Sequence, residues 1–195
     1  MENADAMKGY IYITGNGADP GAGRVLNDPI FSKVPTLGAC MPNIRRAVRK
    51  GDYIFVISGK MPNLQQYVVG GFKVADKIDA LMAHERFPDY RLHRDAEGNL
   101  QGNIIVEPDG KQHPLDHHDP ATFEARIKNY IVGSDPVFLT SDRAVERGRA
   151  QTLGKLSQIL EKPQKNRIID MMGRWAKLDE QQIHKLVDWL TEIKG

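Results

Sequence analysis

The chain has 195 residues, of which 41% are hydrophobic and 27% are charged, and its formal net charge is +2. These values are ordinary for a soluble protein of one domain, or of one domain with an appendage. The net charge is too small to indicate a class of binding partner. The single cysteine excludes an internal disulfide and any metal site built on a cysteine pair, which fits a reducing compartment. No apolar run approaches the roughly 20 residues of a membrane helix, and the polar start is not a signal peptide, so we expect a cytoplasmic protein.

The first part of the chain is rich in strands and irregular loops. Residues 1–8 are expected to form a disordered leader, and the alternating apolar segment Gly9–Gly15 predicts a first strand. Residues 16–35 are dense in Gly, Pro, Asn and Asp and predict a long loop. Loops of that length are usually functional or disordered, so this one is a candidate for a role in binding.

A short helix and the central strands follow this loop. Pro42 suits the first helical position, and the apolar spacing after it predicts a helix from about residue 42 to residue 50 that Gly51 ends. The apolar run Asp52–Gly59 predicts a central strand. The segment Gln65–Ile78 predicts another strand, whose Gly70-Gly71 pair indicates a bulge or a close approach of the backbone.

The middle of the chain carries one more helix and further strands. The segment Ile78–Phe87 predicts a short helix, and residues 99–115 predict a hairpin that turns at Pro108-Asp109-Gly110. The segment Asn129–Ser141 predicts one or two last strands of a mostly antiparallel barrel.

From about Asp142 onward the apolar residues recur with helical spacing in three stripes, one of which contains Trp175. Asp179 and Gln182 form a plausible capping box for the last helix. We therefore predict an α+β protein with a barrel domain over residues 9–141 and a helical extension packed on it over residues 142–195.

One passage resembles a known family. The chain contains the order L-G-A-C-x-P-x-I-R-R-A, then G-D-Y-I, then a Y-V-V-G-G-F-K-V strand, preceded by a G-x-D-P loop. This order resembles the nucleotide modification associated domain families and, more broadly, the PUA-like superfamily with its EVE, ASCH and YTH domains. The residues that carry the match are Leu37, Cys40, Pro42, Ile44, Arg45, Arg46, Gly51 and Asp52, with Gly17, Asp19 and Pro20 in the loop.

The chain also departs from the family pattern. Its loop is longer, the aromatic residue of the loop is displaced to Phe31, and Met41 stands where the family has a lysine after the cysteine. The resemblance covers roughly residues 9–141. It implies a pseudo-barrel with a pocket for a base, often in modified DNA or RNA, and fold alone does not fix function.

The clearest basic cluster lies on the predicted helix at residues 42–50. Arg45 and Arg49 share one face, and Arg46 and Lys50 form the neighbouring row. Guanidinium and ammonium groups match phosphate oxygens, so these four side chains, with Lys60, are candidate nucleic-acid contacts; the alternative is a solvated basic face.

Aromatic side chains supply the candidate base pocket. Most of them are expected in the core, but Tyr12, Phe31 and Tyr67 adjoin loops and are the preferred residues for framing a base. Ser58, at a strand end, is expected to contribute to the same pocket, with the backbone N–H of Gly59. Cys40 is expected to pack beneath its basic rim as a small buried side chain rather than as a nucleophile, since no base stands near it in sequence.

Two further motifs are weighed and set aside. The cluster His113, Asp116, His117, His118 and Asp119 has metal-ligand chemistry, but it lacks helical spacing and lies between prolines, so we expect a polar loop and no metal. The segment GNGADPGAG lacks the lysine of a phosphate-binding loop, and no cofactor is expected.

The leading interpretation is a binding module that recognises a base, in particular a modified one, in DNA or RNA, with no catalytic residue assigned. Two alternatives stay open. One is a nucleotide-processing hydrolase or nuclease that uses Asp19, Asp52 and the His113–Asp119 loop. The other is an adaptor or homodimer that uses the helical extension, with Trp175 and Trp189 as partner anchors.

Overall fold

The computed structural model describes residues 6–195, which form two compact units. Unit 1 contains the described residues up to Val25, together with Gly51–Lys73 and Asp135–Gly195; unit 2 contains Leu26–Lys50 and Val74–Ser134. The chain passes repeatedly from one unit to the other, so this division differs from the boundary at residue 141 that the sequence predicts. The segment of residues 37–52, which carries most of the family resemblance, is also divided: its residues up to Lys50 belong to unit 2, and those from Gly51 onward belong to unit 1.

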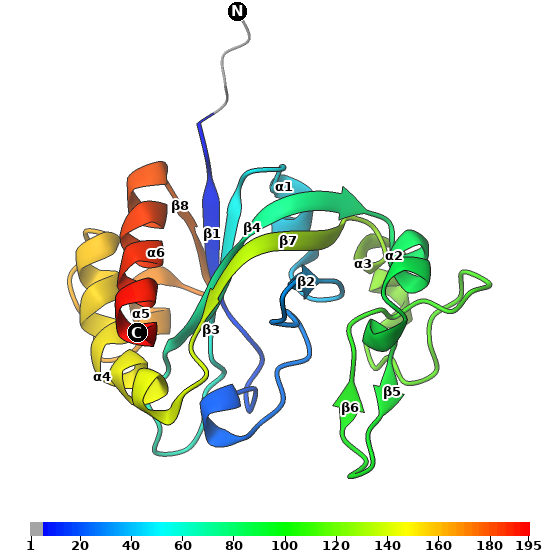
Figure 1. The fold of residues 1–195 in the computed structure, drawn as a ribbon, viewed down its shortest axis with the longest axis horizontal. Helices are drawn as coiled ribbons and strands as arrows, with labels where there is room; N and C mark the ends of the chain where they lie inside the picture. Colours follow the sequence, from blue (N-terminus) through cyan, green and yellow to red (C-terminus); the bar gives the residue numbers. More distant parts are fainter. Residues whose placement is uncertain (1–5) are drawn as a thin grey trace, which may run out of the picture. The chain divides into compact units, whose positions relative to one another are not determined.

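The main sheet has six strands in the order β2-β7-β4-β3-β1-β8 (Figure 1). Strands β1 and β3 are parallel, whereas β1–β8, β3–β4 and β2–β7 are antiparallel pairs. The α+β class and the mostly antiparallel sheet are therefore confirmed. The order has β2 and β8 as its two ends, so the described strands form no closed barrel. The strands are β1 (Gly9–Ile13), β2 (Thr36–Leu37), β3 (Tyr53–Ile57), β4 (Val68–Ile78), β7 (Tyr130–Phe138) and β8 (Trp175–Leu178).

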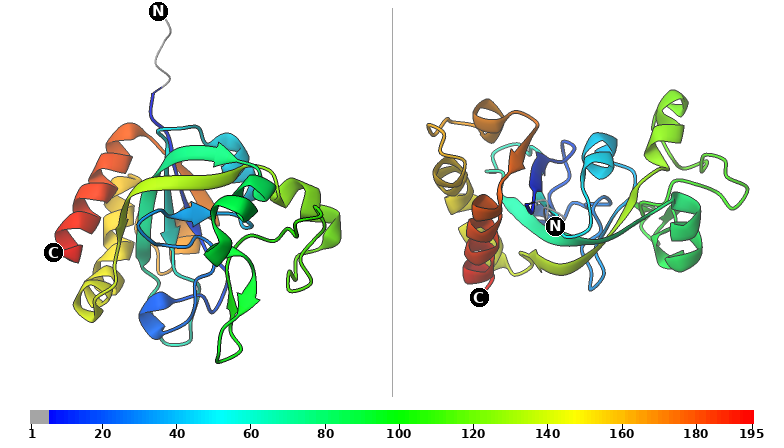
Figure 2. Two further views of the ribbon diagram at one scale, coloured as in Figure 1. Left: turned by 45° about the vertical axis from the view of Figure 1, so that its right-hand side comes forward. Right: turned by 90° about the horizontal axis from the view of Figure 1, so that it is seen from above.

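In unit 1, β3 lies between β4 and β1 in the sheet, and four of its five residues are buried. This position explains why the sequence of β3 is apolar without alternation. Helices α4 (Asp142–Ile159) and α6 (Glu180–Lys194) lie side by side in both orientations of Figure 2. Their apolar stripes are buried, with Leu156 and Leu186 fully excluded from solvent. The predicted capping box of α6 is confirmed, since the Asp179 carboxylate and the Gln182 amide each accept from the other's backbone N–H.

The helical prediction for Trp175 is wrong. Helix α5 (Ile168–Met172) ends at Gly173, which has a φ of 73°, and the chain then forms β8, antiparallel to β1. The reason is tertiary, because β1 pairs with β3 along one edge only, and without β8 the backbone N–H and C=O groups along its other edge would lack a strand partner. Trp175 is 39% exposed and packs with a centroid distance of 6.0 Å on Tyr10.

The glycine pair in β4 has the predicted role. The register between β3 and β4 shifts between Val56 and Ile57, which marks a bulge. A Cβ atom on Gly71 would lie 2.2 Å from the Phe55 ring, and one on Gly70 would lie 2.4 Å from the Val137 carbonyl. The close approach of these backbones therefore requires glycine at both positions.

Unit 2 combines β2 and parts of β4 and β7 with short helices and a separate two-stranded hairpin. Its core contains Ile104, Val106, Phe123 and Tyr130. The turn at Pro108-Asp109-Gly110 is confirmed by the pairing of Val106 with Gln112, but this pairing is an isolated bridge, so the hairpin predicted over residues 99–115 does not form as a pair of regular strands around this turn. The helices are α1 (Pro42–Ala47), α2 (Ala80–Arg86), α3 (Phe123–Arg126), η2 (Pro88–Tyr90) and η3 (Pro120–Thr122), and the hairpin strands are β5 (His93–Arg94) and β6 (Leu100–Gln101), which the sequence did not predict.

The start of the chain is tied to unit 1 where it is described. The Lys8 carbonyl accepts from Tyr53 N, and Lys8 N donates to the Asp52 carboxylate at 3.0 Å. The first five residues of the predicted leader lie outside the described residues. Within residues 6–195, none of the helices has the length and apolar character needed to cross a membrane.

Candidate functional site

The structure divides the predicted site residues between the two units. Those in unit 1 are Tyr12, Ser58, Lys60 and Tyr67; those in unit 2 are Phe31, Cys40, Arg45, Arg46, Arg49 and Lys50.

Arg45 is not a phosphate ligand in this fold, which corrects the prediction for this residue. Its side chain is 0% exposed and its guanidinium donates to the carbonyl oxygens of Ala39, Cys40 and three residues that precede β7 (Arg126, Lys128 and Asn129) at 2.7–3.2 Å. A guanidinium is planar and has five N–H donors, so a single Arg side chain can satisfy several buried carbonyls that converge on it. Arg45 therefore links α1 to the residues just before β7, and the five carbonyls that accept from it all belong to unit 2.

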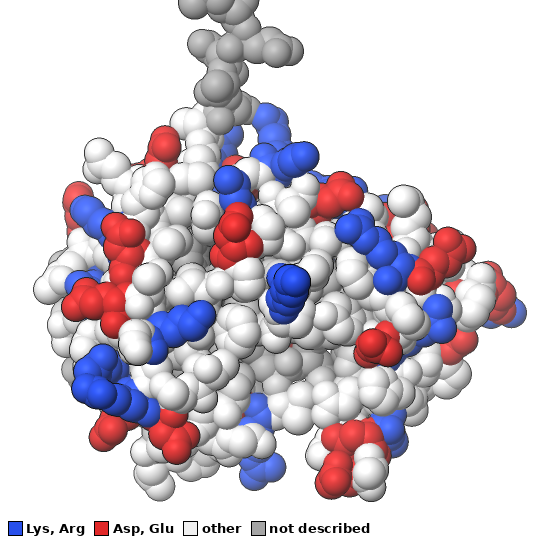
Figure 3. Space-filling view, in the orientation of Figure 1, with Lys and Arg blue, Asp and Glu red and all other residues white. Residues whose placement is uncertain are grey.

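The other three cations of this run do face solvent. Arg46, Arg49 and Lys50 are exposed, because α1 ends at Ala47 and Val48 takes the buried position of the following turn. On the face drawn in Figure 3, basic and acidic side chains alternate, so the positive charge does not gather into one broad area there. These three residues stay candidates for phosphate contact.

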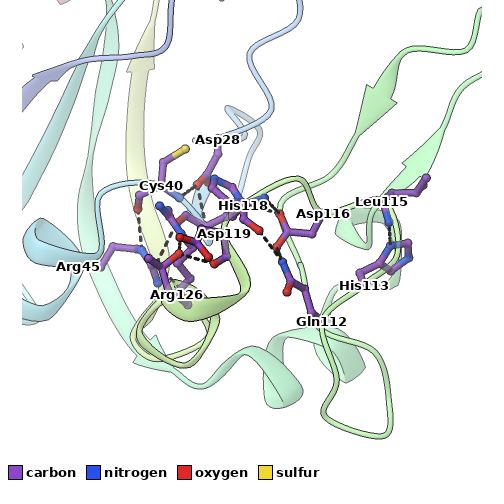
Figure 4. A network of polar contacts seen from close by, with 12 residues as sticks. Asp28, Cys40, Arg45, Gln112, His113, Leu115, Asp116, His118, Asp119 and Arg126 are labelled. Carbon is purple, nitrogen blue, oxygen red and sulfur yellow. Dashed lines mark hydrogen bonds and ion pairs between the residues drawn. The ribbon is translucent and has the colours of Figure 1, made fainter.

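Cys40 belongs to a closed polar network around Asp28, shown in Figure 4. The buried Asp28 carboxylate accepts from the backbone N–H groups of Gly38, Ala39 and Cys40 and from the Asn103 side chain. Burial, followed by the charge and the hydrogen bond of Asp28, raises the pKa of the Cys40 thiol to about 12. A raised pKa keeps the thiol protonated at neutral pH, which disfavours a reactive thiolate. Cys40 is half-buried, however, and not the fully buried side chain that the sequence predicted.

The predicted aromatic frame is not an open surface. Tyr12 is 1% exposed and Tyr67 is 0% exposed, so both are core residues of unit 1, and Ser58 is 0% exposed. The Ser58 hydroxyl accepts from Tyr67 N, and Gly59 N donates to the Ala18 carbonyl, so neither group is available to a ligand. These assignments are corrected: alternation along a strand cannot distinguish a buried face from one that borders a pocket. Phe31, in unit 2, is half-buried.

Lys60, in contrast, lines a pocket of unit 1 that has a volume of about 560 Å³. The pocket lies where the parallel strands β1 and β3 end, and the turns after these strands form two of its walls. The segment from α4 to the start of β8 forms the rest, with Leu153 and Ile168 among its apolar lining residues. Residues of the predicted helical extension, 142–195, thus form part of this pocket.

The polar lining of the pocket has an uneven chemistry. Five residues with amide side chains and three cationic residues line it, whereas the described lining residues include no carboxylate. Of the five amides, that of Gln66 donates to the Ser58 carbonyl at 2.7 Å. Arg167 is paired with Asp170 at 2.7 Å, and Lys60 and Arg174 form no ion pair within the described part of the chain. The amides are Asn16, Asn63, Gln65, Gln66 and Asn166, and the cations are Lys60, Arg167 and Arg174.

Hydrogen bonds fix the two walls that follow β1 and β3. Thr14 N donates to Ile57 O, and Gly17 N donates to Lys60 O at 3.1 Å, so the parallel pairing continues past the strand ends. A Cβ atom on Gly59 would lie 1.9 Å from the Gly15 carbonyl, which shows how closely the two backbones approach. The glycine-rich loop therefore forms a wall of the pocket, to which it contributes Asn16.

The acid–base groups named for the enzyme alternative have other partners. Asp19 is 1% exposed and binds Arg149, and Asp52 accepts from Lys8 N. In unit 2, His113 contacts Glu107 at 3.1 Å and His118 contacts Asp116 at 2.6 Å. No group of three or more His, Cys, Asp or Glu side chains among the described residues has the arrangement of a metal site.

Both tryptophans were candidate partner anchors, and the structure separates them. Trp189 is 3% exposed and donates to Gln151 at 3.0 Å, so it is a core residue, which leaves Trp175 as the exposed one.

Comparison with known proteins gives no relative: no family model, no curated protein and no solved structure matches this chain. The pocket therefore has to be interpreted from its own geometry. Of its lining residues, Lys60 was predicted from sequence. Arg167 and Arg174 were not, because they flank α5 and reach the pocket only through the pairing of β8 with β1.

Proposed function

We propose that the chain is a nucleic-acid-binding module that recognises a base, modified bases included, in DNA or RNA, and that its fold is related to the PUA-like superfamily. The ligand site in this proposal is the pocket at the ends of β1 and β3. The observation that carries the proposal is the lining of that pocket, with cations and amides and without a carboxylate.

The chemistry of the lining suits a nucleotide. Lys60 and Arg174 supply positive charge for phosphate oxygens. An amide presents both donors and an acceptor, which is what the edge of a base requires. No aromatic side chain is among the lining residues, so stacking would fall to the guanidinium planes, which proteins also use against bases.

The size of the pocket agrees with this class of ligand. Its volume of about 560 Å³ lies within the roughly 300–1,000 Å³ of small-molecule sites. The exposed side chains Arg46, Arg49 and Lys50 form a second set of candidate phosphate contacts, within unit 2, since each such contact increases affinity at low salt.

Fluorescence anisotropy with short single- and double-stranded DNA and RNA, with and without modified bases, tests this function across a salt series. We expect Lys60→Ala and Arg174→Ala each to weaken binding and to lower the slope of log K against log salt by about 1. Lys185→Ala is the matched control, because Lys185 is exposed in unit 1 and does not line this pocket. An absence of binding to every probe at low salt would sink the proposal.

Arg46→Ala separates the two sets of cations in the same assay. A smaller salt slope in this variant would add the exposed face of α1 to the interface. An unchanged slope would restrict the phosphate contacts to the pocket of unit 1.

A further inference from the structure

We infer that Arg149 of α4 is a positioning residue for the pocket of unit 1, although its side chain does not line it. The inference rests on the proposed function, because it assigns to Arg149 an effect on ligand affinity. It starts from an ion pair that the glycine-rich loop makes with the middle of α4.

Arg149 makes a two-pronged contact with a buried carboxylate. Its Nη2 lies 2.8 Å from Asp19 Oδ1, and its Nη1 lies 3.0 Å from Asp19 Oδ2. The Asp19 side chain is 1% exposed and that of Arg149 is 15% exposed, so water screens the pair little. The Arg149 guanidinium also lies 4.7 Å above the centre of the Tyr67 ring, which adds a cation–π contact.

The same guanidinium reaches the second wall of the pocket. Arg149 Nη1 donates to the Gln65 carbonyl at 2.6 Å. Asp19 follows Asn16 by three residues, and both Asn16 and Gln65 are lining residues of the pocket. One side chain therefore holds the turn after β1 and the turn after β3 at once.

The loop is shaped to accept this side chain. The Asp19 carboxylate also accepts from Ala22 N and caps η1 (Pro20–Ala22), and Gly21 N donates to the Tyr67 hydroxyl at 2.9 Å. A Cβ atom on Gly21 would lie 2.4 Å from Val145 and 3.0 Å from Arg149 Nη2. Glycine at this position lets the loop pack on α4 closely enough for the fork to reach Asp19.

The planar fork is what allows the double role. A guanidinium can bind both carboxylate oxygens and still present an N–H to a carbonyl, whereas a lysine ammonium is a point charge on a flexible stem. Arg149→Lys therefore keeps the charge beside Asp19 but loses the fixed geometry that holds both turns. Preorganisation of a site contributes to affinity without any contact to the ligand, so affinity should fall while the number of phosphate contacts stays the same.

Arg149→Lys is the test, because Arg149→Ala would leave the buried Asp19 carboxylate unpaired and risks unfolding the protein. With a fluorescein-labelled single-stranded DNA or RNA of mixed sequence, whichever the wild type binds, we expect Kd to rise about tenfold, with an unchanged salt slope. A direct phosphate contact would lower the slope as well, and a purely structural role would leave Kd unchanged well below the unfolding temperature. Either result would overturn the inference. Arg143→Lys, an exposed position on α4, is the control and should bind as the wild type does.

Hydrogen exchange of the full chain keeps this test separate from the proposed function. In Arg149→Lys we expect faster exchange at the amides of Ala18–Arg24 and of Gln65–Gln66, with no change in β1 and β3. Unchanged exchange in the two turns would overturn the positioning role even if the probe binds. If the wild type binds no probe, the proposed function fails, and the exchange result still decides whether Arg149 holds the two walls.

Discussion

The two units use the same kinds of polar side chain in opposite ways. In unit 2, the Arg45 guanidinium donates to backbone carbonyls, and the Asp28 carboxylate accepts from backbone N–H groups and from the Asn103 amide. These donors and acceptors are therefore satisfied within the unit. In unit 1, Lys60 and Arg174 line a pocket of about 560 Å³ and form no ion pair within the described residues. A closed polar network stabilises a fold, whereas polar groups that line a pocket are available to a ligand. The difference can be measured as the free energy of unfolding that each side chain contributes.

The largest expected loss of stability follows Arg45→Ala. The change removes five hydrogen bonds to buried or half-buried carbonyls, of which that of Ala39 keeps a second donor, from Arg126, and it removes a large side chain from the interior. We expect the free energy of unfolding to fall by more than about 3 kcal/mol, measured by denaturant titration. Arg45→Lys should recover little, because a lysine lacks the fork.

The control for this prediction is Arg46→Ala, one position along on the exposed side of α1. A surface change of this kind should stay within about 0.5 kcal/mol of the wild type. Equal losses in the two variants would show that Arg45 does not have the special role that its contacts indicate.

Asp28→Asn should have the next largest effect. Each oxygen of the Asp28 carboxylate accepts from two donors, so an amide NH₂ in place of either oxygen would face N–H groups. We expect a loss of about 2 kcal/mol or more, again from denaturant titration. Asp89→Asn, at an exposed position of unit 2, is the matched control and should change little. A loss below about 0.5 kcal/mol at Asp28 would mean that the network tolerates rearrangement.

Lys60→Ala should have the opposite pattern to the unit 2 variants, with a small effect on stability and a larger effect on binding. Because Lys60 is exposed and unpaired in the described part of the chain, its removal should alter the free energy of unfolding by no more than about 0.5 kcal/mol. The effect should appear in ligand binding instead. A thermal unfolding curve measured beside the anisotropy titration would separate the two, and a large destabilisation would place Lys60 among the structural residues.

The smallest effect at neutral pH concerns Cys40. Its pKa is raised from an ordinary value of 9.0 to about 12, so the folded protein holds the thiol proton more tightly than the unfolded chain does. The resulting stability is fully present below pH 9 and is lost as the pH rises toward 12. At pH 8 the thiolate population is lower than that of an ordinary cysteine by roughly a thousandfold, and alkylation should be correspondingly slow. Rapid labelling of the native protein compared with the denatured chain would contradict this.

Local signals in the sequence predicted most elements correctly. Pro42 starts α1, Asp179 with Gln182 starts α6, and the glycine pair marks the bulge in β4. These succeeded because each depends on the conformation of a few neighbouring residues. The predicted end of the first helix near residue 50, before Gly51, is wrong, since α1 ends at Ala47. Trp175 was misassigned because the register of β8 is set by β1, which lies far away in the chain.

The candidate site was harder to predict for the same reason. Arg45 and Arg46 are adjacent and chemically identical, yet one is fully buried and the other is exposed, and the carbonyls that decide this come from residues 126–129. Lys60 was recognised because it follows a strand end directly. Arg149 was not, since its partners Asp19 and Gln65 come from two other segments of the chain.

The pairing of β1 with β8 has a consequence for synthesis on the ribosome. Gly9 lies opposite Leu178, so the edge of unit 1 beside β1 is completed only after residue 178 has emerged. The segments of unit 2 are all available once residue 134 has been translated. Contacts between residues distant in sequence form slowly, and chains fold as they are made at about 5–20 residues per second. We therefore expect the nascent chain to assemble unit 2 first. Until β8 has been translated, one edge of β1 stays unpaired, and a chaperone can protect that edge.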